Sequence, residues 1–201
     1  GRMTPPRAEW CRYVAGLVQC DTHKERVRYT VQYFKTAPPE PDRAFDRSFG
    51  CFSYDYDEKS KEIKIHFKNV DQSGLGPLSS ARVGARRDEL QKMFAQIKTR
   101  HPEAQSVHGL SWLYAREEYR RLFPDAFNKS LVVHDEDDRY WGTSRWGQFF
   151  TSEGSIHSEI RTQFLKRLEQ LSSTHPHLAF PIQTFVAHAP IKEFYTKYGI
   201  V

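Results

Sequence analysis

Two short segments of alternating apolar and polar residues constrain the fold of this chain more than any other feature. They are residues 51–56 and 61–68, and the turn-forming residues 57–60 separate them. Ile63 and Ile65 share one face of the second segment, because successive side chains of a strand point to opposite faces. The pattern therefore predicts an antiparallel β-hairpin that is buried on one side.

Helical and strand patterns on either side of this hairpin indicate a mixed fold. Helices are predicted where apolar residues recur at a spacing of three and four, and strands where β-branched and aromatic residues cluster. The predicted helices are residues 10–18, 90–97, 116–123, 160–171 and 190–199, and the further predicted strands are residues 27–35, 106–114, 143–150 and 181–187.

This order, antiparallel strands first and alternating strands and helices later, predicts an α+β (mixed α/β) fold. We expect one domain over residues 1–201, with a single mixed, centrally antiparallel sheet and four to five packed helices. Residues 36–41, which contain three prolines, are the one candidate boundary, and we interpret residues 1–2 as the remnant of a tag.

Composition excludes several classes of protein. Aromatic residues make up 14% of the 201 residues, and a disordered chain lacks that much apolar surface. No stretch reaches the roughly 20 apolar residues of a membrane-spanning helix, and nothing after Met3 resembles a signal peptide. The chain has three cysteines, an odd number that cannot form a disulfide framework, so we expect a cytoplasmic protein. The net charge of +5 favours anionic partners, although a solvated basic surface would give the same value.

The segment 74–87 is the strongest candidate for binding a phosphate-bearing small molecule. Its glycines and serines precede a predicted helix that begins with arginines, and positive side chains there oppose the helix dipole. A bound anion would remove this conflict, because free N–H groups, hydroxyls and guanidinium groups all bind phosphate. The alternative is that Asp88 caps the helix and that the arginines precede it in solvent. The candidate anion-binding residues are Gly74, Gly76, Ser79, Ser80, Arg82, Gly84, Arg86 and Arg87.

The order of elements around this segment resembles the core of the GNAT acyltransferase superfamily. Three strands, a loop into a helix, a strand and a helix with the pattern Tyr119-Arg-Arg-Leu-Phe123 cover about residues 50–125. In that family a loop at the start of the helix holds the pyrophosphate of coenzyme A. The resemblance therefore implies an acyltransferase that takes an acyl-coenzyme A-like donor as co-substrate and requires no resident cofactor. It places Arg82, Gly84 and Arg86 at the pyrophosphate and Tyr119 or Tyr195 at the family's later tyrosine.

Three side chains are candidates for the base and the acid of such a transfer. His108 and Tyr114 fall on the strand beyond the glycine-containing loop, and His66 falls on the hairpin. A histidine can deprotonate an acceptor amine, and a tyrosine can protonate the departing thiolate. The alternative is that His108 is a hydrogen-bonded core residue and that Tyr114 only packs.

A non-catalytic module that binds protein or nucleic acid is the alternative function. Aromatic residues interleaved with arginines at residues 139–150 could stack on single-stranded nucleic acid, although a packed strand explains the same pattern. The acidic segment 134–138 lacks the glycine and the distal glutamate of a calcium loop, so we expect no metal site there. Residues 111–114 and 119–124 also resemble a pairing in uncharacterised bacterial proteins, which implies no function.

Overall fold

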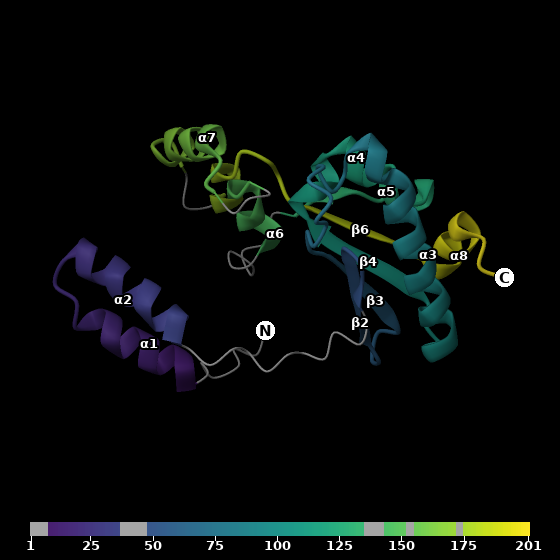
Figure 1. Ribbon diagram of the computed structural model, residues 1–201, viewed down its shortest axis with the longest axis horizontal. Coiled ribbons are helices and arrows are strands. Elements are labelled where there is room, and N and C mark those ends of the chain that lie inside the picture. The colour runs from purple at the N-terminus through teal and green to yellow at the C-terminus, as the bar shows by residue number, and fades with distance from the viewer. Residues whose placement is uncertain (1–7, 37–47, 135–142, 152–154, 172–174) are drawn as a thin grey trace. The chain divides into compact units, whose positions relative to one another are not determined.

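The computed structural model describes residues 8–36, 48–134, 143–151, 155–171 and 175–201 (Figure 1). The chain divides into two compact units, Gly1–Ala44 and Phe45–Val201, where the sequence predicts a single domain. The division falls just beyond the proline-rich segment, of which residues 37–41 lie outside the described residues. Among the described residues, no helix combines the length and the apolar character needed to span a lipid bilayer.

The N-terminal unit is a pair of helices, α1 (Ala8–Val18) and α2 (His23–Thr36). Helix α1 confirms the helix predicted at residues 10–18. A capping box begins α2: the Thr22 N–H donates to the Glu25 carboxylate at 2.9 Å, and the Glu25 N–H donates to the Thr22 hydroxyl at 3.2 Å. This reciprocal pair satisfies two of the N–H groups that a helix start leaves without intrahelical partners.

The strand predicted at residues 27–35 is wrong, because these residues lie in α2. Tyr29 and Tyr33 are four residues apart, so a helix places them on the same face, where both rings pack on Tyr13 of α1. The Tyr29 ring also closes over Gly16, and a Cβ at that position would collide with it. Contacts between the two helices therefore outweigh the strand propensity of this segment.

The C-terminal unit is built on a six-stranded mixed sheet with the strand order β1-β2-β3-β4-β6-β5. The strands are β1 (Ser48–Phe49), β2 (Phe52–Asp57), β3 (Glu62–Phe67), β4 (Ser106–Ser111), β5 (Val132–Val133) and β6 (Phe185–Pro190). This sheet confirms the mixed α/β class, and the antiparallel pair β2–β3 confirms the predicted hairpin.

The centre of the sheet differs from the prediction of antiparallel pairing. Strands β3 and β4 are parallel, whereas every other neighbouring pair of described strands is antiparallel. Helix α3 (Val83–Arg100) connects β3 to β4, and parallel neighbours need such a crossover, because the chain must return to the end of the sheet from which it started.

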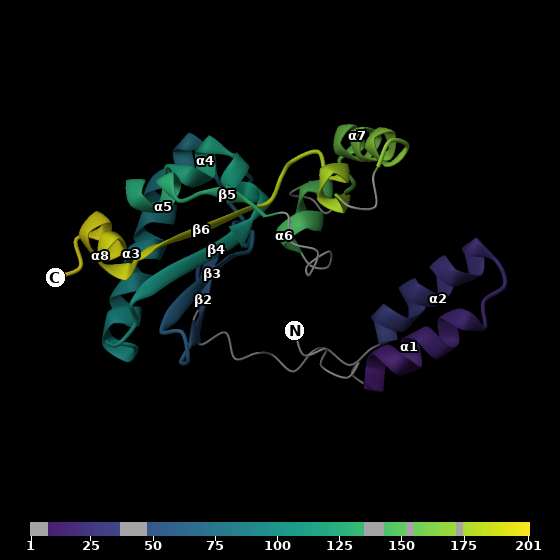
Figure 2. The same cartoon turned by 180° about the vertical axis from the view of Figure 1, so that it is seen from behind.

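One face of this sheet is covered by helices. Helix α3, α4 (Glu117–Arg120), α5 (Asp125–Lys129) and α8 (Ile191–Tyr198) share one core with the inward side chains of the strands. Figures 1 and 2 both show α4 and α5 on the same side of the strands. Helices α3 and α8 confirm two predicted helices, and Gly199 ends α8 in the left-handed conformation (φ 64°). On the opposite face the alternate side chains are exposed, as for Asp55 and His66, or half-buried, as for Lys64 and His108.

Helical turns separate β5 from β6 and contradict the strand predicted at residues 143–150. They are α6 (Thr143–Trp146), the short 3-10 helix η3 (Gly147–Phe149), α7 (Ser158–Leu168) and η4 (Pro176–Ala179). Trp146 and Phe149 lie three residues apart, so a helical turn brings both rings against Phe164 and Phe180, with centroids 5.0–6.2 Å apart. Of the acidic segment 134–138, His134 alone lies within the described residues.

Candidate functional site

A cleft opens where the parallel strands β3 and β4 end. Residues 62–64 pair with residues 106–108, and the two strands are not paired beyond that point. Their carboxyl ends therefore diverge, and a cleft of about 840 Å³ lies between them. The volume falls within the range of ligand pockets, roughly 300–1,000 Å³. Ligands of open α/β sheets also bind outside the carboxyl ends of strands.

Four segments line this cleft: the end of β3, the loop 76–79 before α3, the end of β4 with the helical turns that follow it (residues 110–119), and residues 147–151. The turn after β4 is the short 3-10 helix η2 (Trp112–Ala115), so the strand predicted over residues 106–114 ends at Ser111. The Ser111 hydroxyl caps this turn by accepting the Leu113 N–H at 3.1 Å. The early end of the strand brings the aromatic residues 112 and 114 to the cleft.

Among the eight candidate anion-binding residues, Gly76 and Ser79 line the cleft. The hydroxyl oxygen of Ser79 is buried and has no hydrogen-bond partner among the described residues. Ser79 directly precedes the short 3-10 helix η1 (Ser80–Arg82), which runs into α3, and its side chain makes no capping hydrogen bond. A buried polar group without a partner is costly, so this hydroxyl is suited to bind a ligand. Exposed positions away from the cleft lining are Gly74, Ser80, Gly84 and Arg87.

Two of the arginines at the start of α3, Arg82 and Arg86, pair with Asp71 within the protein. The Asp71 side chain is 1% exposed, and it accepts a hydrogen bond from Arg82 Nε at 2.6 Å and lies 3.2 Å from Arg86 Nη2. Hydrogen bonds from Ser73, and then the bond and charge of Arg82, hold the pKa of Asp71 well below its usual range. The conflict with the helix dipole is thus removed without a bound anion. The alternative capping residue, Asp88, is also wrong, since α3 begins after Arg82.

Arg86 belongs to this buried cluster and does not reach the cleft. Its side chain is 3% exposed and pairs with Glu89 at 2.7 Å, and its Nη1 donates to the Cys51 sulfur at 2.6 Å. Burial raises the pKa of Glu89 and that of the Cys51 thiol. The predicted contact of Arg86 with a phosphate is therefore replaced by a structural role. Arg82 is 30% exposed and uses its Nε for Asp71, so it remains the accessible arginine of the pair.

Two buried tyrosines contribute to the lining of the cleft. Tyr114 and Tyr119 both line it and are 1% and 2% exposed. The Tyr114 hydroxyl lies so close to Gly109 of β4 that a Cβ there would collide with it. Burial raises the pKa of both hydroxyls, so both stay protonated, and a hydrogen bond from Tyr119 partly offsets this effect on Tyr114. Of the two tyrosines named for the later position, Tyr119 lines the cleft, whereas Tyr195, on α8, is not part of its lining.

Of the two histidine candidates, one lines the cleft and the other does not. His66, at the end of β3, lines it, and its Nε2 lies 2.9 Å from the Asp55 carboxylate. His108 is half-buried on β4, in register with Lys64 and His188, and does not line the cleft. The structure therefore brings His66, Tyr114 and Ser79 to one cavity and leaves His108 outside it.

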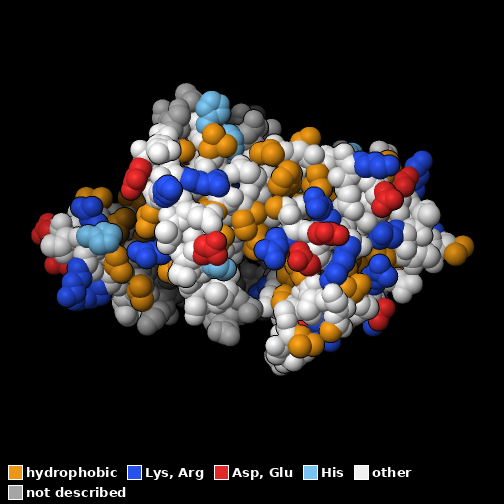
Figure 3. Space-filling view, turned by 90° about the horizontal axis from the view of Figure 1, so that it is seen from above, with side chains coloured by type: hydrophobic (Ala, Val, Ile, Leu, Met, Phe, Trp, Pro, Cys, Tyr) orange, Lys and Arg blue, Asp and Glu red, His pale blue; other side chains and the backbone are white. Residues whose placement is uncertain are grey.

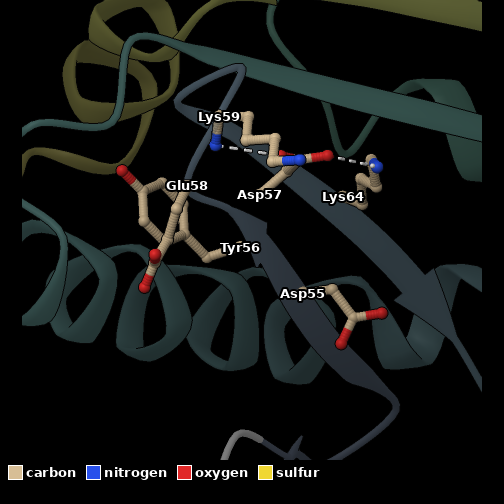
Figure 4. Close-up of a pocket in the computed structure, with 6 residues that line it drawn as sticks. All are labelled: Asp55, Tyr56, Asp57, Glu58, Lys59 and Lys64. Atoms are coloured by element: carbon tan, nitrogen blue, oxygen red, sulfur yellow. Dashed lines mark hydrogen bonds and ion pairs between the residues drawn. The ribbon is translucent and has the colours of Figure 1, made fainter.

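A second, smaller hollow of about 380 Å³ at the hairpin turn is structural. Asp57 accepts the Lys59 N–H at 3.1 Å and pairs with Lys64 at 3.1 Å, so its charge is satisfied within the turn (Figure 4). Asp55 also lines this hollow but points away from the turn residues in the same view. An aspartate that folds back on the N–H groups after it is a common way to hold a turn.

Two aspartates that bond to candidate site residues, Asp55 to His66 and Asp71 to Arg82, are not among the candidates that the sequence indicates. Aspartate is unusual in a strand, so Asp55 beside a histidine-bearing strand is a signal for a side-chain pair. Asp71 is followed two residues later by Ser73, whose N–H it accepts at 2.9 Å, and this spacing is typical of a turn. Neither signal reveals that the side chain reaches a residue eleven positions further along the chain.

Within the described ranges, no three or more His, Cys, Asp or Glu side chains are arranged to hold a metal ion. No protein-family model matches the chain, and neither a curated protein nor a solved structure matches it. The assignment of a function therefore rests on the geometry of the cleft.

Proposed function

We propose that the protein is a GNAT-like acyltransferase that binds an acyl-coenzyme A-like donor in the cleft between β3 and β4. The observation that carries the proposal is the divergence of these two parallel strands beside the start of α3. These three elements, β3, α3 and β4, belong to the order of elements that resembles the GNAT superfamily. A cleft at this point of the sheet is suited to an extended ligand with one anionic end.

The phosphate end of the donor would lie at Ser79. Its hydroxyl is buried and unpartnered among the described residues, and the first N–H groups of η1 follow directly. Hydroxyls and N–H groups at a helix start suit a phosphate, and Arg82, which already pairs with Asp71, lies three residues along the chain with its side chain 30% exposed. Phe67, Leu110 and Leu113 supply apolar walls for the less polar part of the donor.

The chemistry would be transfer of an acyl group from sulfur to an acceptor amine. The amine nitrogen attacks the thioester carbonyl, a C–N bond forms, and the C–S bond breaks with its electron pair going to sulfur. His66 takes the proton that the amine releases. Tyr114, which burial keeps protonated, donates a hydrogen bond to the departing thiolate, and solvent supplies the proton that the sulfur finally carries.

A calorimetric titration of the full chain with coenzyme A and acetyl-coenzyme A tests the proposal. We expect saturable binding that Ser79→Ala weakens by about 10- to 150-fold, because a hydrogen bond to a charged group contributes about 1.5–3 kcal/mol. Ser80→Ala is the matched control, since Ser80 is exposed and is not part of the cleft lining, and it should bind like the wild type. Absence of binding by either ligand, or equal binding by both variants, would contradict the proposal.

The alternative, a non-catalytic binding module, is favoured by the exposed basic residues Lys24, Arg26 and Arg28 of α2. In the view of Figure 3, however, many Lys and Arg side chains lie beside Asp and Glu side chains. Single-stranded DNA in the same titration separates the two functions. Binding of DNA that weakens steeply with salt, without a response to coenzyme A, would replace the acyltransferase by a nucleic-acid-binding module.

A further inference from the structure

The geometry points to Asp55 as a positioning residue that holds His66 in one tautomer, with Nε2 protonated and Nδ1 as the basic nitrogen of the cleft. This inference adds a residue to the proposed acyltransferase site and rests on that function for its catalytic consequence. The tautomer itself is a property of the free protein.

The register of the hairpin brings the two side chains together. Ser53 of β2 is opposite His66 of β3, and Asp55 is opposite Lys64, so Asp55 is the diagonal neighbour of His66 on the same face of the sheet. Diagonal neighbours lie within reach of long side chains. The Asp55 Oδ2 and His66 Nε2 atoms are 2.9 Å apart, which is a hydrogen-bond distance.

The chemistry of the two groups decides which nitrogen carries the proton. An ionised carboxylate only accepts hydrogen bonds, whereas a neutral imidazole has one N–H donor and one acceptor nitrogen. Nε2 therefore donates to Asp55, and Nδ1 keeps its lone pair. Among the described residues, no hydrogen bond to Nδ1 competes with a substrate, and His66 lines the cleft.

Asp55 is not required by the local fold in the way that Asp57 is. Asp57 binds the turn N–H groups and Lys64, and Figure 4 shows Asp55 pointing away from that group. The bond to His66 is the single side-chain hydrogen bond of Asp55 in the described part of the chain. Replacing Asp55 should therefore change the imidazole without unfolding the hairpin, and Asp57 provides a matched control on the same strand.

The test is the tautomer of His66 in the ¹⁵N-labelled full chain, read from long-range ¹H–¹⁵N NMR spectra at about pH 8.5, where an imidazole is neutral. We expect the Nε2–H form in the wild type and in Asp57→Asn. In Asp55→Asn we expect a mixture of both tautomers, because an amide can donate as well as accept. An Nδ1–H form in the wild type, or an unchanged tautomer in Asp55→Asn, would overturn the inference.

Turnover with acetyl-coenzyme A and a set of primary amines tests the catalytic consequence. His66→Gln should lower kcat by about 10²- to 10⁴-fold, the usual contribution of a general base, and Asp55→Asn should lower kcat with an unchanged KM for the donor. Wild-type kcat in Asp55→Asn would overturn the positioning role. The NMR result needs neither donor nor acceptor, so a failure to bind coenzyme A would refute the proposed function while the Asp55–His66 pair is still tested.

Discussion

Replacing Arg86 by methionine should destabilise the C-terminal unit by about 3 kcal/mol. The Arg86 guanidinium lies 3.2 Å from Asp71, 2.7 Å from Glu89 and 2.6 Å from the Cys51 sulfur, and its side chain is 3% exposed. Removing one partner of a buried ion pair costs about 3–5 kcal/mol, because the remaining charge stays buried without compensation. Asp71 keeps Arg82 as a partner, so we expect the lower end of this range.

Urea unfolding of the full chain, followed by circular dichroism, measures this loss. Thermal unfolding should show a fall of roughly 6–12 °C, because about 1 kcal/mol corresponds to roughly 2–4 °C in a unit of this size. Arg87→Met is the control: Arg87 is exposed, and its loss should change the stability by less than about 0.5 kcal/mol. The double variant Arg86→Met/Glu89→Met should lose less than the sum of the single variants, because it leaves no uncompensated glutamate.

The same variant also separates a structural role of Arg86 from contact with a ligand. Folded Arg86→Met should bind coenzyme A as tightly as the wild type, because Arg86 is not part of the cleft lining. Equal stability of the Arg86→Met and Arg87→Met variants, combined with a loss of coenzyme A affinity in the former, would refute this reasoning and restore Arg86 as a phosphate ligand.

Three further outcomes are expected. The folded-state pKa of Asp71 lies below its unfolded value of about 3.9, so wild-type stability should fall as the pH drops below about 4, and urea midpoints of Asp71→Asn should fall less over that interval. Gly109→Ala should cost about 1–3 kcal/mol in urea unfolding, because the methyl group would collide with the Tyr114 hydroxyl, and an unchanged midpoint would contradict this packing. Thr22→Ala should remove about 1 kcal/mol from α2 and speed its amide hydrogen exchange by about fivefold, with no change in the sheet.

The sequence predicts correctly those elements in which buried residues recur at one spacing, every second residue in a strand or every third and fourth residue in a helix. The alternation over residues 61–68 gave the hairpin β2–β3, and the apolar stripe at residues 90–97 gave α3. The β-branched and aromatic residues of segments 27–35 and 143–150 predict strands, yet both segments are largely helical. Strand propensity reflects packing on a sheet surface, and these side chains pack on other rings brought together from distant parts of each unit.

The sequence also does not indicate that β3 and β4 pair in parallel. Each strand by itself carries the same period in a parallel or an antiparallel pair, so the pattern of residues does not distinguish them. The direction of β4 follows from the path of α3 over the sheet, and the cleft exists because the two strands diverge after three paired residues.

For the site, the sequence by itself determined the chemical groups and the tertiary structure decided their partners. Serine, histidine and tyrosine were identified as candidates from their positions beside predicted strands and loops, and Ser79, His66 and Tyr114 do line one cleft. The sequence favours an external anion as the ligand of the arginines at the start of α3, yet Asp71 folds back and pairs with Arg82 and Arg86. The interaction of two charges depends on their distance and burial, and neither quantity is set by their separation along the chain.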